Sequence, residues 1–70
     1  MDILIFITSV EKPEQVSEVK PLLTAVPAIS GWNFDLEDCD KILRVEGPDF
    51  VKNNIIVMLT ELGYICEVLE

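Results

Sequence analysis

The sequence contains no histidine and only two cysteines among its 70 residues. Without histidine, the chain lacks the side chain that most often acts as a general base near neutral pH. The two thiols, Cys39 and Cys66, are too few to staple a secreted mini-protein, so we expect free thiols in a reducing, cytoplasmic compartment. No glycine-rich phosphate loop, metal-ligand cluster of histidine and cysteine, or catalytic triad is present. We therefore expect a protein that is not an enzyme and needs no cofactor.

Long apolar runs and basic residues are scarce as well. The apolar run at residues 3–7 is too short for a signal peptide or a membrane span, and Asp2 stands where a signal peptide carries a basic residue. Five basic residues are set against thirteen acidic ones, which gives a net charge of −8. This charge repels nucleic acid and anionic lipid, so we expect neither as a partner.

Half of the residues are hydrophobic, which argues against disorder, and the length predicts a single domain over residues 1–70. Residues 2–8 are apolar on both faces, as is typical of a central strand. Pro13 begins a helical pattern whose apolar residues recur as far as Val26, and this pattern predicts a helix to about Ala25. Pro21 lies inside that helix, where we expect a kink or a break.

Residues 31–47 predict a β-hairpin. Residues 32–36 alternate between apolar and polar, residues 37–40 form a polar turn, and residues 41–46 form the second strand. This register places Trp32, Phe34 and Leu36 on one face, opposite Leu43 and Val45. Trp32 is then a core or partly exposed residue.

A second helix is expected to start at the Gly47–Pro48–Asp49 sequence and to end at Gly63, before a last strand at residues 64–69. Its buried face is predicted to comprise Val51, Ile55, Met58 or Leu59, and Leu62, with Phe50 alongside. Cys66 on the last strand is interpreted as a small buried hydrophobe.

The order of elements is therefore βαββαβ. Right-handed crossovers place both helices on one face of a four-stranded antiparallel sheet of order 4-1-3-2, which is the ferredoxin-like α+β arrangement. The other face is left uncovered, and alternate residues would expose apolar side chains there: Ile3, Ile5, Ile7, Ile42, Ile65 and Leu69. Neighbouring exposed isoleucines mark an interface, so a homodimer formed through this face is one hypothesis.

Several stretches resemble the heavy-metal-associated domains, which are the copper-chaperone-like modules also found at the front of metal-pumping ATPases. The helical residues 16–23 and the segment 26–29 are similar to that family's helix and its Leu-Pro-Gly-Val exit. Residues 32–37 resemble its Val-x-Val-Asp-Leu-Glu strand, and residues 62–64 resemble its closing Gly-Tyr strand. The resemblance covers nearly the whole chain and implies the ferredoxin-like fold.

The family binds a soft cation such as Cu(I) through a Met-x-Cys-x-x-Cys loop, because sulfur ligands suit that ion. The methionine position of this loop falls on Val10, and the two cysteine positions fall on Lys12 and Gln15. Neither Lys12 nor Gln15 supplies a thiolate, and the lysine charge repels a cation. The resemblance therefore implies the fold without the usual metal site, and a bound metal ion is not expected.

Cys39, in the hairpin turn, is the remaining candidate for chemistry, although its flanking carboxylates disfavour a reactive thiolate. The topology places Cys39, Lys12 and Tyr64 around the same end of the molecule. Two functions stay open. The chain is either a non-enzymatic module that binds a protein partner or itself, through the open sheet face or this rim, or a metal-binding or metal-transfer protein with a non-standard site around Cys39.

Overall fold

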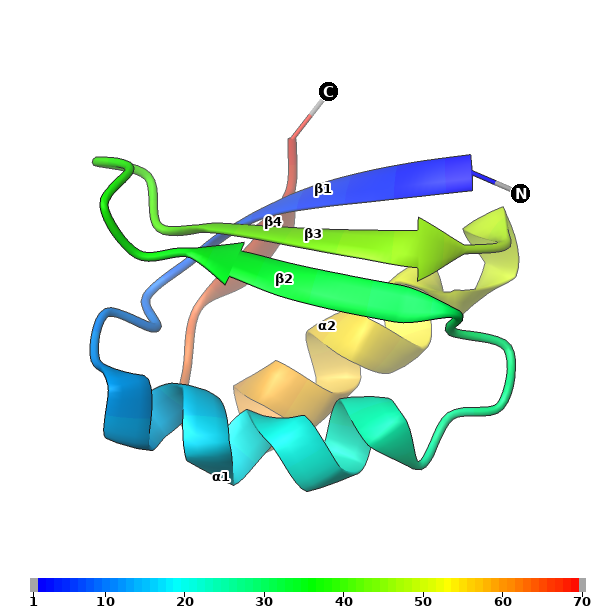
Figure 1. Ribbon diagram of the computed structural model, residues 1–70, viewed down its shortest axis with the longest axis horizontal. Coiled ribbons are helices and arrows are strands. Elements are labelled where there is room, and N and C mark those ends of the chain that lie inside the picture. Colours follow the sequence, from blue (N-terminus) through cyan, green and yellow to red (C-terminus); the bar gives the residue numbers. More distant parts are fainter. Residues whose placement is uncertain (1, 70) are drawn as a thin grey trace.

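The computed structural model describes residues 2–69, which form a four-stranded antiparallel sheet, two α-helices and one short 3₁₀ helix (Figure 1). The strands are β1 (Asp2–Thr8), β2 (Gly31–Asp35), β3 (Ile42–Gly47) and β4 (Cys66–Val68), and the helices are α1 (Pro13–Thr24), η1 (Asp49–Val51) and α2 (Lys52–Glu61). Both α-helices lie on the same side of the sheet (Figure 1). The expected α+β class is therefore confirmed. Within residues 2–69, no helix has the length and apolar character needed to cross a bilayer.

The strands of the sheet lie in the order β2-β3-β1-β4, which is the expected order 4-1-3-2 counted from the opposite edge. β1 is paired with β3 from Asp2 to Ile7 and with β4 from Phe6 to Thr8, so it is an inner strand. The hairpin register is also as expected, because Trp32 lies opposite Val45 and Phe34 lies opposite Leu43.

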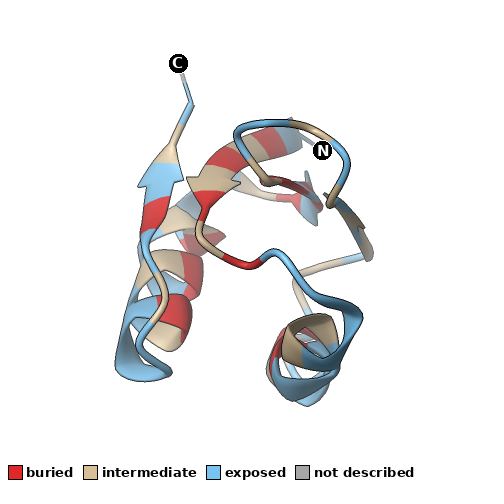
Figure 2. Cartoon of the chain, turned by 90° about the vertical axis from the view of Figure 1, so that its left-hand side faces the viewer, coloured by how far each residue is buried: buried red, intermediate tan, exposed pale blue. Residues whose placement is uncertain are grey.

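The core lies between the sheet and the helices, where buried segments of both layers face one another (Figure 2). Side chains alternate between the two faces of a strand, so every second residue of β1 and β3 points toward the helices. The fully buried apolar side chains are Phe6, Val10, Val19, Leu23, Leu43, Val45, Val51, Ile55 and Leu59. The apolar residues expected to face inward from the first helix and the hairpin therefore do so.

The break expected at Pro21 is wrong, because α1 continues through it to Thr24. A proline inside a helix costs about 3 kcal/mol, since it removes one hydrogen bond and crowds the preceding turn. The helix residues Val19 and Leu23 are both fully buried. Each such side chain contributes roughly 1.5–3 kcal/mol on burial, so their packing is sufficient to offset the cost of Pro21.

The start and end of the second helix also differ from the expectation. Residues 49–51 form the 3₁₀ turn η1, which places Val51 in the core and leaves Phe50 71% exposed. Leu62 is 39% exposed, because it follows the last helical residue. Gly63 adopts the left-handed φ of 92° that ends a helix, as predicted.

The last strand is shorter than expected, with β4 covering only Cys66–Val68. The backbone N–H of Tyr64 donates to Leu59 O (2.9 Å), so this residue closes the end of α2 instead of pairing with β1. Two further backbone hydrogen bonds extend the contact beyond the two ends of β4, from Leu69 N to Ile5 O (2.8 Å) and from Ser9 N to Ile65 O (3.1 Å).

We predict that Leu43→Ala lowers the free energy of unfolding by about 2–5 kcal/mol, because it leaves a cavity in the middle of the core. A chain of this size has a total stability of roughly 4–10 kcal/mol, so this variant is close to unfolding. Urea denaturation followed by circular dichroism measures the change. Leu62→Ala is the matched control, since its side chain is partly exposed, and an equal loss in both variants would contradict the assigned core.

Candidate functional site

The three positions predicted to correspond to the metal loop of the heavy-metal-associated domains lie at the junction of β1 and α1: Val10 is in the connecting loop, Lys12 is the N-cap of α1, and Gln15 is in its first turn. Val10 is fully buried in the core, and its N–H donates to Thr8 Oγ1 (3.2 Å). The side-chain oxygen Oε1 of Gln15 accepts hydrogen bonds from the backbone N–H groups of Glu11 (2.9 Å) and Lys12 (3.0 Å). These interactions fix the loop against the first turn of α1, so Val10 and Gln15 have structural roles here.

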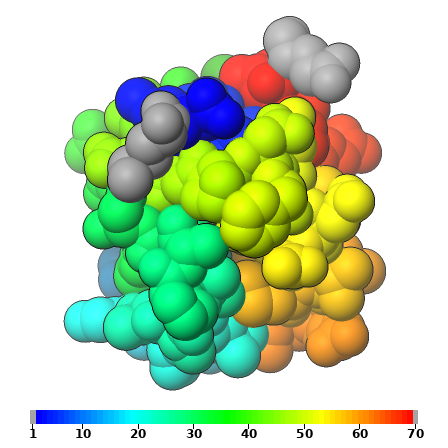
Figure 3. Space-filling model, turned by 90° about the vertical axis from the view of Figure 1, so that its right-hand side faces the viewer, coloured from blue at the N-terminus to red at the C-terminus, as the bar shows by residue number. Residues whose placement is uncertain are grey.

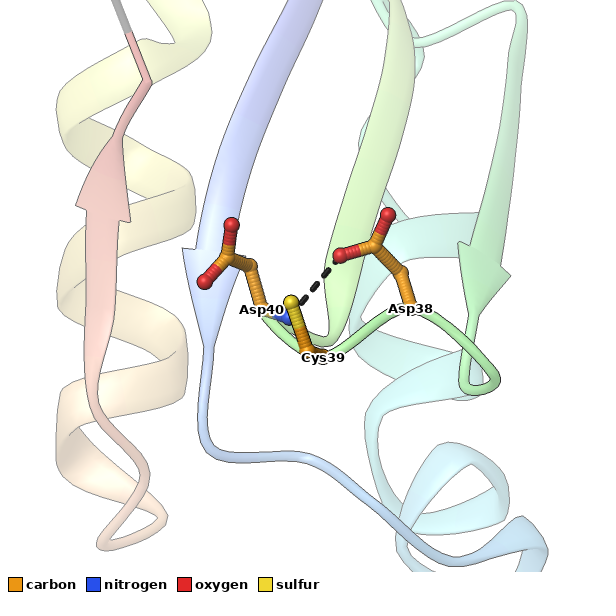
Figure 4. Close-up of side chains that lie close together, drawn as sticks. All are labelled: Asp38, Cys39 and Asp40. Carbon is orange, nitrogen blue, oxygen red and sulfur yellow. Dashed lines mark hydrogen bonds between the residues drawn. The ribbon is translucent and has the colours of Figure 1, made fainter.

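The tip of the β2–β3 hairpin gathers one thiol and two carboxylates (Figure 4). One ligand atom each of Asp38, Cys39 and Asp40 lies within 4.8 Å of the others. The turn is held by a hydrogen bond from Asp40 N to Asp38 Oδ1 (2.8 Å) and by one from Lys41 Nζ to Leu36 O (3.1 Å). Cys39 and Asp40 are exposed, so this group of side chains is accessible to an ion or a reagent.

Three loops lie at the same end of the molecule: the hairpin tip, the β1–α1 loop and the α2–β4 loop (Figure 2). The base of the tip is anchored to β1, because Thr8 donates from its hydroxyl to Lys41 O (2.7 Å). Among residues 2–69, however, no hydrogen bond or ion pair joins Cys39 to Lys12 or to Tyr64. The interaction rim of Lys12, Cys39 and Tyr64 therefore stays a prediction.

The phenol of Tyr64, in the α2–β4 loop, lies near the Glu18 carboxylate of α1. Partial burial and the nearby Glu18 carboxylate, which also accepts a hydrogen bond from the phenol, raise the pKa of Tyr64 above its ordinary value. The shift has no effect at neutral pH, where a tyrosine is protonated in any case. This contact could not be found from the sequence, because Glu18 and Tyr64 are far apart along the chain.

Cys66 lies on β4 and is buried in the core, as expected. Burial, with a smaller contribution from Glu67, raises the pKa of the Cys66 thiol to about 11. A protonated thiol is a weak metal ligand and a poor nucleophile. Both cysteines are free, and only Cys39 is exposed.

The face of the sheet opposite the helices, which we term the open face, has an apolar centre. Because Leu4 and Phe6 point into the core, strand alternation turns Ile3, Ile5 and Ile7 to the open face. Ile3 is 61% exposed, whereas Ile5 and Ile7 are half-buried by their neighbours. The isoleucines of β1 thus form a continuous apolar line on the outside of the molecule.

Charged and polar side chains flank this line on β3. The strand pairing places Arg44 beside Ile5 and Glu46 beside Ile3, and both charged residues are exposed. Ile42 shares the open face but is only 8% exposed, so it adds little to the accessible surface. The apolar surface is therefore narrower than the sequence suggests.

On the β4 side, Leu69 lies next to Ile5 and is 44% exposed. Ile65 is exposed but precedes β4, at the end of the molecule where the three loops lie. Of the six apolar residues expected on the open face, Ile3, Ile5, Ile7 and Leu69 thus form its accessible centre.

A shallow hollow of about 430 Å³ lies where β4 stops short of the beginning of β1. It is lined by the first four described residues of β1, by Val68 and Leu69, and by the ion pair of Lys52 with Asp49 (2.8 Å). Figure 3 looks from the end at which β1 begins, with the N-terminal strand and the C-terminal residues at the top of the molecule. The hollow is wide open to solvent.

No protein-family model matches this chain, and no curated protein matches it either. The accessible features that remain for a function are the open face and the hairpin tip.

We predict that the two thiols differ sharply in reactivity. At about pH 8, a chromogenic disulfide reagent modifies Cys39 at once and modifies Cys66 only when the protein unfolds, because Cys66 is buried and its pKa is raised. Absorbance against time, with and without denaturant, measures the two phases. Cys39→Ser should remove the fast phase and Cys66→Ala the slow one, so a rapid reaction of both thiols in the folded protein would contradict this structure.

The same thiol links stability to pH. The folded state favours the protonated form of the Cys66 thiol, because its pKa is raised there to about 11. The contribution of this thiol to the free energy of unfolding is therefore complete below the unfolded-state pKa near 8.5, and it is lost as the pH rises through about 11.

Proposed function

We propose that this chain is a small, non-enzymatic interaction module of the cytoplasm, which binds a protein through the open face of its sheet. We further propose that its fold is the ferredoxin-like one and that it is similar to the heavy-metal-associated domains, without their metal site. The sheet order and the antiparallel hairpin support the fold. The buried Val10 and the hydrogen-bonded Gln15, at two of the metal-loop positions, support the loss of that site.

The observation that carries this proposal is the line of Ile3, Ile5 and Ile7 on the open face. An inner strand with large apolar residues on both faces is expected where both faces are covered. Here the helices cover only one face of β1. An apolar centre with a charged border is the usual composition of an interaction surface, and a net charge of −8 favours protein over nucleic acid as the partner.

A photo-crosslinking side chain introduced at Ile3 tests this surface in the source cells. We expect one product of defined mass, because a bound protein would lie over this exposed residue. Gel electrophoresis and mass spectrometry identify the product and show whether it contains two copies of this chain or one copy and a different protein.

The matched control places the same crosslinker at Val57, which is an exposed apolar residue of α2. Val57 should give no product of that mass. Equal products from both positions, or none from Ile3, would contradict an interface on the open face.

The hairpin tip supports a second candidate function, which is the binding or transfer of a metal ion. The specific observation is that Cys39 brings a thiol within 4.8 Å of carboxylate oxygens of Asp38 and Asp40. A thiolate suits a soft ion such as Cu(I), whereas carboxylates suit harder ions. Three adjacent residues of a turn, two of them exposed, are a weak and mixed ligand set, so we place this function second.

Titration of the reduced protein with Cu(I) and Zn(II) against a competing chelator separates the two functions. We expect the wild-type chain to retain neither ion. Lys12→Cys combined with Gln15→Cys is the positive control, because it places two thiols at the positions that match the family's metal loop. Retention of one equivalent by the wild-type chain, lost on Cys39→Ser, would favour the metal function instead.

A further inference from the structure

Arg44 is an exposed cation in the middle of the open face. The strand pairing places it between Asn33 of β2 and Ile5 of β1. Within residues 2–69, its guanidinium forms no ion pair or side-chain hydrogen bond. Arginine is enriched at protein interfaces, where its planar group binds carboxylates in a fixed geometry. An exposed arginine without an ion pair, next to an apolar line, is therefore suited to bind a carboxylate of a partner molecule.

The chain itself carries a matching carboxylate on the same face. Glu46 is exposed, lies two residues along β3 from Arg44, and has Ile3 as its neighbour on β1. The open face therefore contains two adjacent rows, Arg44 with Ile5 and Glu46 with Ile3. The rows are separated by two strand residues, about 6.8 Å.

From this charge pattern we propose that the open face binds a second copy of this chain about a two-fold axis that lies between the two rows, perpendicular to the strands. This axis exchanges the rows. Arg44 of each copy then faces Glu46 of the other, and Ile5 of each copy faces Ile3 of the other. This inference rests on the proposed function and adds the identity of the partner and its orientation.

Other two-fold arrangements of the same faces are less favourable. An axis through the row of Arg44 places the two arginines opposite each other. An axis parallel to the strands, between β1 and β3, places Asp35 opposite Glu67, because both belong to the row of Ile7. Like charges in direct opposition across an interface are costly, and among the axes compared only the proposed one gives Arg44 a carboxylate partner.

The shape of the molecule agrees with this choice. The hairpin tip lies at the Ile7 end of the sheet and rises on the side away from the helices (Figure 1). An axis between the rows of Ile3 and Ile5 lies toward the other end of β1. The tips of the two copies are then at opposite ends of the dimer, and the acidic row of Asp35 and Glu67 is at its border.

The size of the face sets the strength of the dimer. Strands of about six residues at spacings of about 4.8 Å give a footprint of roughly 14 × 20 Å, which is small compared with a standard interface of about 800 Å² per partner. The dimer should therefore dissociate on dilution. The isoleucines supply the apolar contact, while the Arg44–Glu46 pairs fix the orientation.

Charge exchange between two variants tests this arrangement. We expect Arg44→Glu and Glu46→Arg each to weaken self-association by at least about tenfold, because each alone places like charges opposite each other. An equimolar mixture of the two variants should regain association, since both glutamates of the first variant then face the two arginines of the second. Sedimentation equilibrium over a range of concentrations measures the mass, and circular dichroism confirms that each variant is folded.

Two further variants complete the experiment. The double exchange Arg44→Glu with Glu46→Arg on one chain should dimerise by itself, whereas Lys20→Glu, an exposed charge change on α1, should leave the wild-type dimer unchanged. A wild-type chain that stays monomeric at millimolar concentration would overturn the second copy as partner. A mixture that fails to regain the dimer mass would overturn the proposed axis.

The results also test the open face as an interface separately from the proposed dimer. If the wild type dimerises and Ile5→Lys abolishes the dimer while the charge exchange has no effect, the axis is wrong and the open face is still the interface. If the crosslinker at Ile3 captures only a different protein, the partner is not a second copy of this chain, and the open face is still the interface. If Ile5→Lys leaves the dimer intact, the face and the axis are both wrong.

Discussion

The structure depends on β1, which is paired on both sides and apolar on both faces. Leu4 and Phe6 enter the core on one side, and the helices cover them. Within residues 2–69, no further element covers the other side. The line of Ile3, Ile5 and Ile7 therefore lies on an uncovered face. These isoleucines give the sheet an apolar outer surface and are not part of the hydrophobic core.

The loops at the hairpin-tip end of the molecule are held by local contacts. Gln15 binds two backbone amides at the start of α1, Val10 fills the core, and Tyr64 joins the last loop to Glu18. These contacts stabilise the loops against the helix layer. Cys39 is exposed on the hairpin turn, whereas Cys66 is buried in the core.

Much of the fold could be predicted from the sequence, because strand alternation and helical spacing are set by burial. The hairpin register followed from Trp32 and Phe34, and the inner strand followed from its apolar residues on both faces. Three features could not be predicted in this way. Helix packing overrode the local effect of Pro21, the 3₁₀ turn exposed Phe50, and closure of α2 by Tyr64 shortened the last strand. Each depends on contacts between segments that a local pattern does not contain.

The shortness of β4 has a consequence for solubility. The backbone N–H of Leu69 donates to Ile5 O, so the backbone groups of Ile3, two residues earlier, face the same edge of β1. Since β4 pairs with β1 only as far as Val68, the backbone groups of Ile3 have no strand partner at this edge among residues 2–69. An open strand edge is a template for intermolecular β-pairing and fibre growth. Asp2 stands at this edge, and like charges of −8 on every copy keep edges apart. The acidic composition therefore protects the protein against aggregation, and this protection fades where acid or salt removes the repulsion.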